Sequence, residues 1–433
     1  MPFSPWPRPV DDPQNQTDPR PAARPRLGPR PLALHLALHS LTWASSLCAL
    51  PGLRSASPVW NPALASDPRA EREAQALSEA ARSLPAEDVA RAVARAAAKR
   101  SQEFALGVSA YLAHPETREL SDPPVLWQDG AARLLDYGAG SAGAKGRPVL
   151  VVPSLVNRFY ILDLAADCSL LRFLAASGLR PLVIDWGDPG PSELAFDLAA
   201  VIDGPLAGAL DFATTAAQGP VPVVGYCMGG LLAVALAARR PAQVAALALL
   251  ATPWDFSAPA LGGQASLIRA LAPHIGTALA RLGQLPVDLL QAMFLSLDPY
   301  GGLAKFRAFA KLDPAGAKAR RFVQLEDWLN DGVPLAGPVA RESLIGWYAR
   351  NEPGLGAWTV GDTQVTPERL TQPALVIVPE HDRIVPPESA FPLGRALPNA
   401  RTLSLAAGHI GMVVGGRARD ILHRPLADWL ARH

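Results

Sequence analysis

One cysteine stands in a setting that suits a catalytic nucleophile. Cys227 lies between Gly225 and Gly229, after a β-branched run that begins at Val221 and before an alanine- and leucine-rich stretch. Strand, sharp turn and helix around a central nucleophile form the G-x-S-x-G elbow, here with cysteine in place of serine. So tight a turn strains the backbone and leaves no room for side chains at the two glycines. The Cys227 thiol is therefore predicted to be a nucleophile, with the Met228 amide donating to an oxyanion.

A thiol nucleophile needs a base and a group that orients this base. Asp382 and His409 follow Cys227 in the chain, each just after a predicted strand, and 409 − 382 = 27 residues separate them. Nucleophile, acid, histidine is the order found in α/β-hydrolases. We expect His409 to take the thiol proton and Asp382 to hold the imidazole in the required tautomer. A second oxyanion donor is expected at Leu155, in the loop after the strand at 149–152.

Each of these residues also has a structural interpretation. A lone cysteine is usually a packing residue, an aspartate often begins a helix, and a histidine can be buried with both nitrogens satisfied. The glycines around Cys227 and the chain order favour the catalytic interpretation. The histidines have no metal-ligand spacing and the elbow is the sole glycine-rich turn, so no metal, nucleotide or flavin cofactor is expected. Three polar residues near strand ends rank below the chosen pair, namely Asp255, Glu380 and His381.

The composition indicates a globular protein and argues against some classes of partner. Hydrophobic residues make up 49% of the 433 residues and charged residues 18%, which allows a large core. The formal net charge of +1 gives no reason to expect binding to nucleic acid or to an anionic membrane. Cys48, Cys168 and Cys227 lie far apart, which argues against a disulfide framework and for a reducing compartment, by default the cytoplasm. Cys48 and Cys168 are expected to be packing residues.

The chain divides into three regions. Residues 1–31 are rich in proline and arginine and are predicted to be disordered. Residues 32–123 are predicted to form a helical N-terminal extension. Within it, 32–50 is interpreted as an amphipathic helix rather than a membrane or targeting element, because polar residues interrupt the apolar run. Residues 124–433 are predicted to form an α/β-hydrolase catalytic domain.

The extension shows helical periodicity in its second half. Residues 83–88 contain a break followed by a helix start with acidic residues in the first turn. Apolar residues then recur at spacings of about three and four: Val89, Val93, Ala96, Phe104, Val108, Tyr111 and Leu112. This stripe predicts one buried helix face, with arginines on a solvated face opposite.

Short apolar runs alternate with helical patterns through the catalytic domain. They occupy residues 148–153, 180–185, 221–225, 244–250, 373–378 and 401–405. Uninterrupted apolar strands alternating with helices indicate a mainly parallel sheet covered on both faces. Asp129 and Gly130 predict a hairpin turn ahead of this set. From 253 to about 370 no convincing buried strand occurs, so a helical cap insertion is expected there.

With these residues in view, the chain resembles the polyhydroxyalkanoate synthases, and among them the shorter class III catalytic subunits. The likeness covers about residues 124–433 and rests on five segments in order. These are residues 154–164, 185–187, 225–230, the acid loop at 382–387, and 408–411. Within these segments Asp163 and Trp186 match recurrent positions of the family, and no chemistry is assigned to them.

The resemblance implies an acyltransferase. Cys227 would accept a 3-hydroxyacyl group from coenzyme A as a thioester, and His409 and Asp382 would assist attack by the hydroxyl of another acyl unit, which extends a polyester. Coenzyme A would then be part of the substrate rather than a cofactor. The resemblance also raises a polyester granule, a second synthase subunit and a homodimer as partners.

Two other functions compete with this one. A cysteine-dependent hydrolase, such as a polyester depolymerase, a thioesterase or a dienelactone hydrolase-like enzyme, would use the same elbow with water as the attacking group. Dienelactone hydrolases are much smaller and lack a cap as long as residues 253–370. A non-catalytic granule-associated protein would not need the complete set of Cys227, Asp382 and His409.

Overall fold

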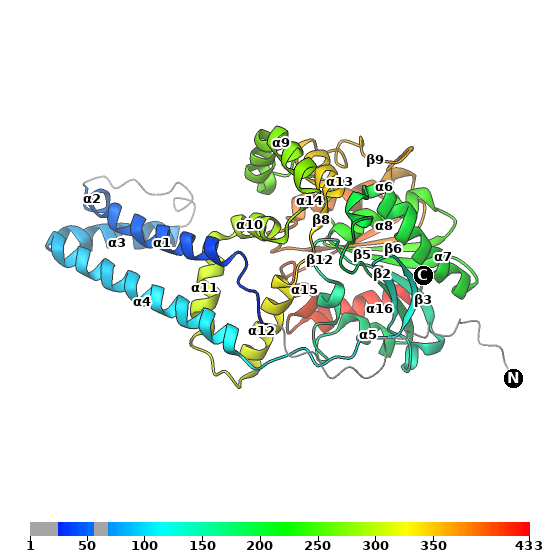
Figure 1. Ribbon diagram of the computed structural model, residues 1–433, viewed down its shortest axis with the longest axis horizontal. Coiled ribbons are helices and arrows are strands. Elements are labelled where there is room, and N and C mark those ends of the chain that lie inside the picture. The colour runs from blue at the N-terminus through cyan, green and yellow to red at the C-terminus, as the bar shows by residue number, and fades with distance from the viewer. Residues whose placement is uncertain (1–24, 56–67) are drawn as a thin grey trace. The chain divides into compact units, whose positions relative to one another are not determined.

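The computed structural model describes residues 25–55 and 68–433, which form two compact units (Figure 1). The first unit contains Thr117–Leu290 and Asp327–His433, and the second contains Pro25–Glu116 and Gln291–Glu326. The prediction of disorder for residues 1–31 lies mostly outside the described residues. Only residues 25–31 of that segment are described, and they form neither helix nor strand.

An eight-stranded sheet forms the centre of the first unit, in the order β1-β2-β4-β3-β5-β6-β11-β12. Neighbouring strands from β4 to β12 run parallel, whereas β2 is antiparallel to β4 and forms an antiparallel hairpin with β1. This topology confirms the predicted α/β architecture and all six predicted parallel strands. The strands are β1 Val125–Asp129, β2 Ala132–Asp136, β3 Arg147–Val152, β4 Leu179–Asp185, β5 Val221–Tyr226, β6 Val244–Leu250, β11 Ala374–Pro379 and β12 Ala400–Leu405.

The pattern of burial explains why the sequences of these strands are continuous apolar runs. Every residue of β4, β5 and β11 is buried, because helices α5, α7, α8 and α14 pack against the sheet. The predicted hairpin turn is present, and Gly130 adopts a positive φ of 56° there. Parallel strands end at one edge of the sheet, so β5, β11 and β12 deliver the residues that follow them to a common edge.

The helices of the first unit connect the strands and follow the last of them. They are α5 Leu170–Ala176, α6 Leu198–Val201, α7 Ala207–Ala217, α8 Met228–Arg239, α9 Gly262–Leu282, α13 Gly337–Arg341, α14 Pro387–Ala396, α15 Gly411–Val414 and α16 Arg424–Leu430. Shorter 3-10 and π turns include η3 Phe159–Asp163, η5 Ile202–Leu206, η7 Glu342–Ala349 and η9 Arg419–His423.

The expected cap interval contributes no strand to the central sheet between β6 and β11. It contains helices and four two-residue strands, β7 Gln284–Leu285, β8 Leu335–Ala336, β9 Thr359–Val360 and β10 Thr363–Gln364. The interval is divided between the two units, because Gln291–Glu326 belongs with the N-terminal helices while the remainder stays with the sheet. The sequence did not indicate this division.

The second unit is helical, as predicted for the N-terminal extension. Its N-terminal helices are α1 Leu32–Cys48, α2 Leu50–Leu53, α3 Pro68–Ser83 and α4 Ala86–Ala113, and α10 Val287–Leu297, α11 Pro299–Phe309 and α12 Ala317–Asn330 supply or border its later part. Helices α1, α3 and α11 all contact α4. The core combines Phe104, Val108, Tyr111, Leu303, Phe306, Phe309, Ala319 and Val323. The predicted stripe on α4 is buried at Val89, Phe104, Val108 and Tyr111, but Leu112 is exposed.

Helix α1 buries two histidines, a feature that the sequence did not suggest. His39 accepts a 3.0 Å hydrogen bond from Trp43 at Nδ1, and its Nε2 pairs with the Ser101 hydroxyl at 2.8 Å. Burial, with Lys305 nearby, lowers the pKa of His35 to about 4. Four leucines of α1 are exposed instead, namely Leu32, Leu36, Leu41 and Leu47. No helix in the described part of the chain is both long and apolar enough to cross a membrane.

Candidate active site

Cys227 occupies the turn between β5 and α8, as predicted. Its φ of 55° and ψ of −125° are strained for a residue with a side chain. The backbone amide of Cys227 donates a 2.9 Å hydrogen bond to the Leu250 carbonyl at the end of β6, which ties the turn to the neighbouring strand. Cys227 is partly exposed.

Close packing requires glycine on both sides of the nucleophile. A Cβ at Gly225 would collide with the backbone of Gly230 in the first turn of α8. A Cβ at Gly229 would collide with the carbonyl oxygens of Val152 and Pro153, which follow one another at the end of β3. Helix α8 therefore begins in direct contact with the start of the loop after β3, and glycine allows this approach.

Replacing Gly229 with alanine is expected to destabilise the chain and reduce activity. The new methyl group can be accommodated only if the backbone at Val152 and Pro153 moves, and overpacking of this kind costs about 1–3 kcal/mol. Denaturant unfolding measures the loss of stability. Gly276→Ala is the matched control, because Gly276 lies inside α9 with open space around its Cα, and alanine there should stabilise by up to about 1 kcal/mol. Equal effects of the two variants would contradict the packing argument.

His409 and Asp382 lie next to each other and both are buried. The Nδ1 of His409 donates to Oδ2 of Asp382 at 2.6 Å. The other oxygen of Asp382 accepts hydrogen bonds from the amides of Ile384 and Val385, both at 2.8 Å. The carboxylate is therefore fixed from two sides. Because Nδ1 of His409 is bound to Asp382, Nε2 is the nitrogen available to Cys227.

The electrostatics of the site favour a charged imidazole. Burial lowers the pKa of His409, but the charges of Cys227 and Asp382 and the hydrogen bond to Asp382 raise it by a larger amount, so that the pKa moves from an ordinary 6.5 to about 10. Tyr226 covers the imidazole with its ring centroid 5.2 Å from that of His409. At neutral pH this arrangement can hold a charged imidazole bonded to Asp382. A cation of this kind near a thiol in general favours the thiolate, which is the nucleophilic form.

The His409 ring is expected to remain protonated through neutral pH and to lose its proton as the pH rises through about 10. Nuclear magnetic resonance of labelled histidine measures this titration directly. In Cys227→Ala the neighbouring charge that contributes most to raising the pKa is absent, so the titration should move to lower pH. Cys168→Ala is the control and should leave the His409 titration unchanged. A His409 pKa that is the same in wild type and Cys227→Ala would contradict the proposed pairing.

The competing polar residues have other surroundings. Asp255 accepts hydrogen bonds from the amide and hydroxyl of Ser257 and from the side chain of Asn351, which accounts for it as a turn residue. Glu380 and His381 are exposed. Within residues 25–55 and 68–433, no group of three or more His, Cys, Asp or Glu residues could hold a metal ion.

The loop after β3 carries the second predicted oxyanion donor, Leu155. Ser154 begins a turn there, since its hydroxyl accepts a 3.2 Å hydrogen bond from the Val156 amide. The indole of Trp186 donates to the Pro153 carbonyl at 3.1 Å and so fixes the beginning of the loop. Trp186 had no assigned role from the sequence, and the structure gives it a structural one.

The two remaining cysteines differ from each other. Cys168 is buried, as expected for a packing residue. Cys48 is exposed at the end of α1, so the expectation that it packs in a core is wrong.

Two family models match the chain. The model of the alpha/beta hydrolase fold matches residues 147–415, and the model of the poly-beta-hydroxybutyrate polymerase N-terminus matches residues 61–174. The first match spans more than half of the chain and confirms the predicted α/β-hydrolase fold. The second match extends the family likeness upstream of residue 124, into the helical extension.

Three curated relatives share the description poly(3-hydroxyalkanoate) polymerase subunit PhaC. The protein of Haloferax mediterranei is 30% identical over 71% of this chain and 63% of its own length. Those of Synechocystis sp. and Allochromatium vinosum are 32% and 30% identical over 66% and 68% of this chain, and over 77% and 83% of their own lengths. The chain thus spans less than two thirds of the first relative and more than three quarters of the other two. It belongs to the poly(3-hydroxyalkanoate) polymerase family within the α/β-hydrolase superfamily.

Proposed function

We propose that the chain is an acyltransferase that polymerises 3-hydroxyacyl-coenzyme A through a covalent acyl-Cys227 intermediate. The observation that carries this proposal is the buried pair of His409 and Asp382, joined at 2.6 Å, beside a strained thiol turn. Family membership supplies the reaction type, because the relatives are named as polymerases.

In the first step the Cys227 thiolate attacks the carbonyl carbon of the acyl-coenzyme A thioester. The electron pair moves to the carbonyl oxygen, and the amides of Met228 and Leu155 would stabilise this oxyanion. Its collapse breaks the bond to the coenzyme A sulfur, which leaves as a thiol with the proton of His409. One thioester replaces another, so the acyl-enzyme forms at nearly balanced energy.

In the second step the hydroxyl group of another acyl unit attacks the Cys227 thioester. His409 takes the hydroxyl proton while Asp382 stabilises the resulting imidazolium. An ester bond forms and the Cys227 thiolate is released. Water in place of the hydroxyl would give a free acid, which is the hydrolase alternative.

We also propose that the chain works in the cytoplasm at the surface of its polyester product. Three exposed leucines of α1, Leu32, Leu36 and Leu47, share one side of the helix and offer an apolar face to such a surface. A reducing compartment keeps Cys227 usable. The proposed partner is a second synthase subunit or a second copy of the chain. Sedimentation of the purified chain distinguishes the two, because only self-association doubles the mass without another protein.

Incubation of the purified chain with 3-hydroxybutyryl-coenzyme A tests the proposed reaction. Free coenzyme A is followed with a thiol reagent, and the acyl product is identified by chromatography. Polymer supports the synthase. Free 3-hydroxybutyrate would instead establish the hydrolase, and the absence of coenzyme A release would indicate a non-catalytic protein.

A further inference from the structure

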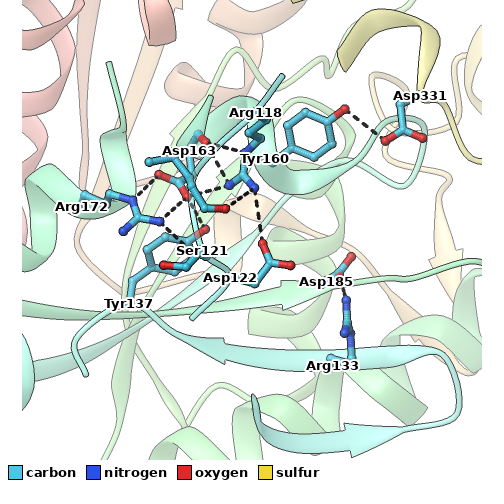
Figure 2. A network of polar contacts seen from close by, with 11 residues as sticks. Arg118, Ser121, Asp122, Arg133, Tyr137, Tyr160, Asp163, Arg172, Asp185 and Asp331 are labelled. Atoms are coloured by element: carbon cyan, nitrogen blue, oxygen red, sulfur yellow. Dashed lines mark hydrogen bonds and ion pairs between the residues drawn. The ribbon is translucent and has the colours of Figure 1, made fainter. Parts of the chain in front are cut away.

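The loop at residues 153–163, here named the oxyanion loop, is fixed firmly at its C-terminal end. Asp163 is fully buried, and its carboxylate accepts four hydrogen bonds (Figure 2). Arg118 donates at 2.9 Å, Arg172 at 2.8 and 3.1 Å, and the Tyr137 hydroxyl at 2.9 Å. Two guanidinium groups more than compensate the charge of this buried carboxylate, so this anchor belongs to the permanent structure of the domain.

A second set of contacts holds the middle of the oxyanion loop to residues 327–333, here named the latch segment. Asp331 is its central residue. One oxygen of Asp331 accepts a 3.0 Å hydrogen bond from the Tyr160 hydroxyl, and the other lies 3.0 Å from the Nε of Arg158 (Figure 2 shows the Tyr160 contact). Both carboxylate oxygens thus engage the oxyanion loop.

Contacts to the backbone of the oxyanion loop align the latch segment with the same part of the loop. The Trp328 indole donates to the Arg158 carbonyl at 2.8 Å. The Val333 amide donates to the Val156 carbonyl at 3.3 Å, and Asn157 and Gly332 form an antiparallel bridge. The latch segment therefore runs beside residues 156–160 as a short strand-like partner, one to five residues from Leu155.

The Asp331 contacts are partly shielded from water. Burial raises the pKa of the Tyr160 phenol, and the Asp331 charge raises it further, so the phenol stays a hydrogen-bond donor at any working pH. Arg158 is 22% exposed and Asp331 is 46% exposed. Asp331 is thus accessible enough for water to replace its hydrogen-bond partners, whereas Asp163 is not. Of the two anchors of the loop, Asp331 is therefore the one whose contacts can change.

We propose that Asp331 is a positioning residue that holds the Leu155 amide where the oxyanion forms. This inference rests on the proposed function only in assigning an oxyanion to Cys227 chemistry. Leu155 lies between the contact of Pro153 with α8 and the bonds to the latch segment, so its place is set from both sides. Oxyanion donors must lie within a few tenths of an ångström of the developing charge, and a loosened loop loses this placement.

Asp331→Ala is expected to lower kcat for 3-hydroxybutyryl-coenzyme A about 10- to 100-fold with KM changed less than about threefold, since a displaced donor costs less than a deleted one. Asp188→Ala is the matched control. Asp188 is 73% exposed and also pairs with Arg158, at 2.7 Å, but it lies outside the latch segment and should leave kcat within about threefold. Equal losses in the two variants would overturn the proposal.

Two further measurements separate positioning from general damage. The aldehyde 3-hydroxybutyraldehyde adds to the Cys227 thiol, and the oxygen of the resulting thiohemiacetal occupies the oxyanion position. Its affinity should fall in Asp331→Ala by about the same factor as kcat, whereas alkylation of Cys227 by iodoacetamide should keep its wild-type rate. A loss of alkylation rate would mean that Asp331 supports the thiol and His409 instead, which overturns the proposal.

The aldehyde also separates this inference from the proposed function. If wild type releases no coenzyme A but binds the aldehyde, the proposed polymerase fails, and the aldehyde affinities of Asp331→Ala and Asp188→Ala still decide the role of Asp331. If the aldehyde binds wild type and Asp331→Ala equally, the positioning role is wrong even in an active polymerase. An aldehyde that does not bind wild type would overturn the oxyanion site and the role of Asp331 together.

Discussion

Replacing Cys227 with alanine is expected to reduce coenzyme A release from 3-hydroxybutyryl-coenzyme A by at least about 10⁴-fold, because no other group in the turn can form the acyl-enzyme. The substitution removes only the sulfur, so the positive φ of residue 227 and the packing of the glycines around it remain. Mass spectrometry after brief exposure to substrate should show an acyl adduct on wild type and none on Cys227→Ala.

The other two cysteines provide the controls for this loss. Cys168→Ala removes a buried thiol and Cys48→Ala an exposed one, so together they represent both environments. Each variant should keep turnover within about threefold of wild type, since neither sulfur lies in the elbow. Full turnover in Cys227→Ala would falsify the nucleophile assignment.

The fold of the catalytic domain could be predicted because its signals are local. The central strands are uninterrupted apolar runs, and this pattern arises when both faces of a parallel sheet are covered. The order of Cys227, Asp382 and His409 along the chain also follows from topology, because each residue comes directly after a strand and the strands end at one edge. The nucleophile motif at Cys227 therefore helped to identify Asp382 and His409, which lie far away in the sequence.

The set of chain segments that make up the second unit could not be predicted in the same way. Periodicity showed that α4 has a buried face, but an amphipathic pattern does not identify the partner helix. The partner is α11, almost 200 residues later. Gly107 of α4 lies against the Phe306 backbone, and the His114 side chain pairs with the Pro314 carbonyl at 2.9 Å. Residues 291–326 were therefore assigned to a cap although they complete the N-terminal helical unit.

Asp163 shows what local reasoning missed in the segment after β3. It was noticed only as a recurrent position, with no chemistry assigned. The available signal was a charged residue within the apolar run at 161–164, because a buried carboxylate needs positive or donor partners. Those partners, Arg118, Tyr137 and Arg172, come from three separate segments, so no spacing in the sequence links them to Asp163.

Replacing Asp382 with asparagine is expected to reduce coenzyme A release about 10³- to 10⁴-fold, because the imidazole is then held in the wrong tautomer. An amide nitrogen facing Nδ1 of His409 donates to it, so the ring proton moves to Nε2, the nitrogen that must accept the thiol proton. The asparagine oxygen can still accept from the amides of Ile384 and Val385, so the loop should keep its shape. Steady-state kinetics and circular dichroism of the variant measure the two effects separately.

Asp255→Asn is the matched comparison, because Asp255 is the competing carboxylate near a strand end. The Asp255 carboxylate accepts hydrogen bonds from Ser257 and Asn351, and an asparagine oxygen can accept most of them, so activity should stay within about threefold. Equal losses in the two variants would mean that the wrong carboxylate was chosen. The charge of Asp382 also raises the pKa of His409, so in Asp382→Asn the His409 titration should move below about 10, while in Asp255→Asn it should not move. A shift without a rate loss would show that Asp382 sets the charge of His409 but does not orient it for catalysis.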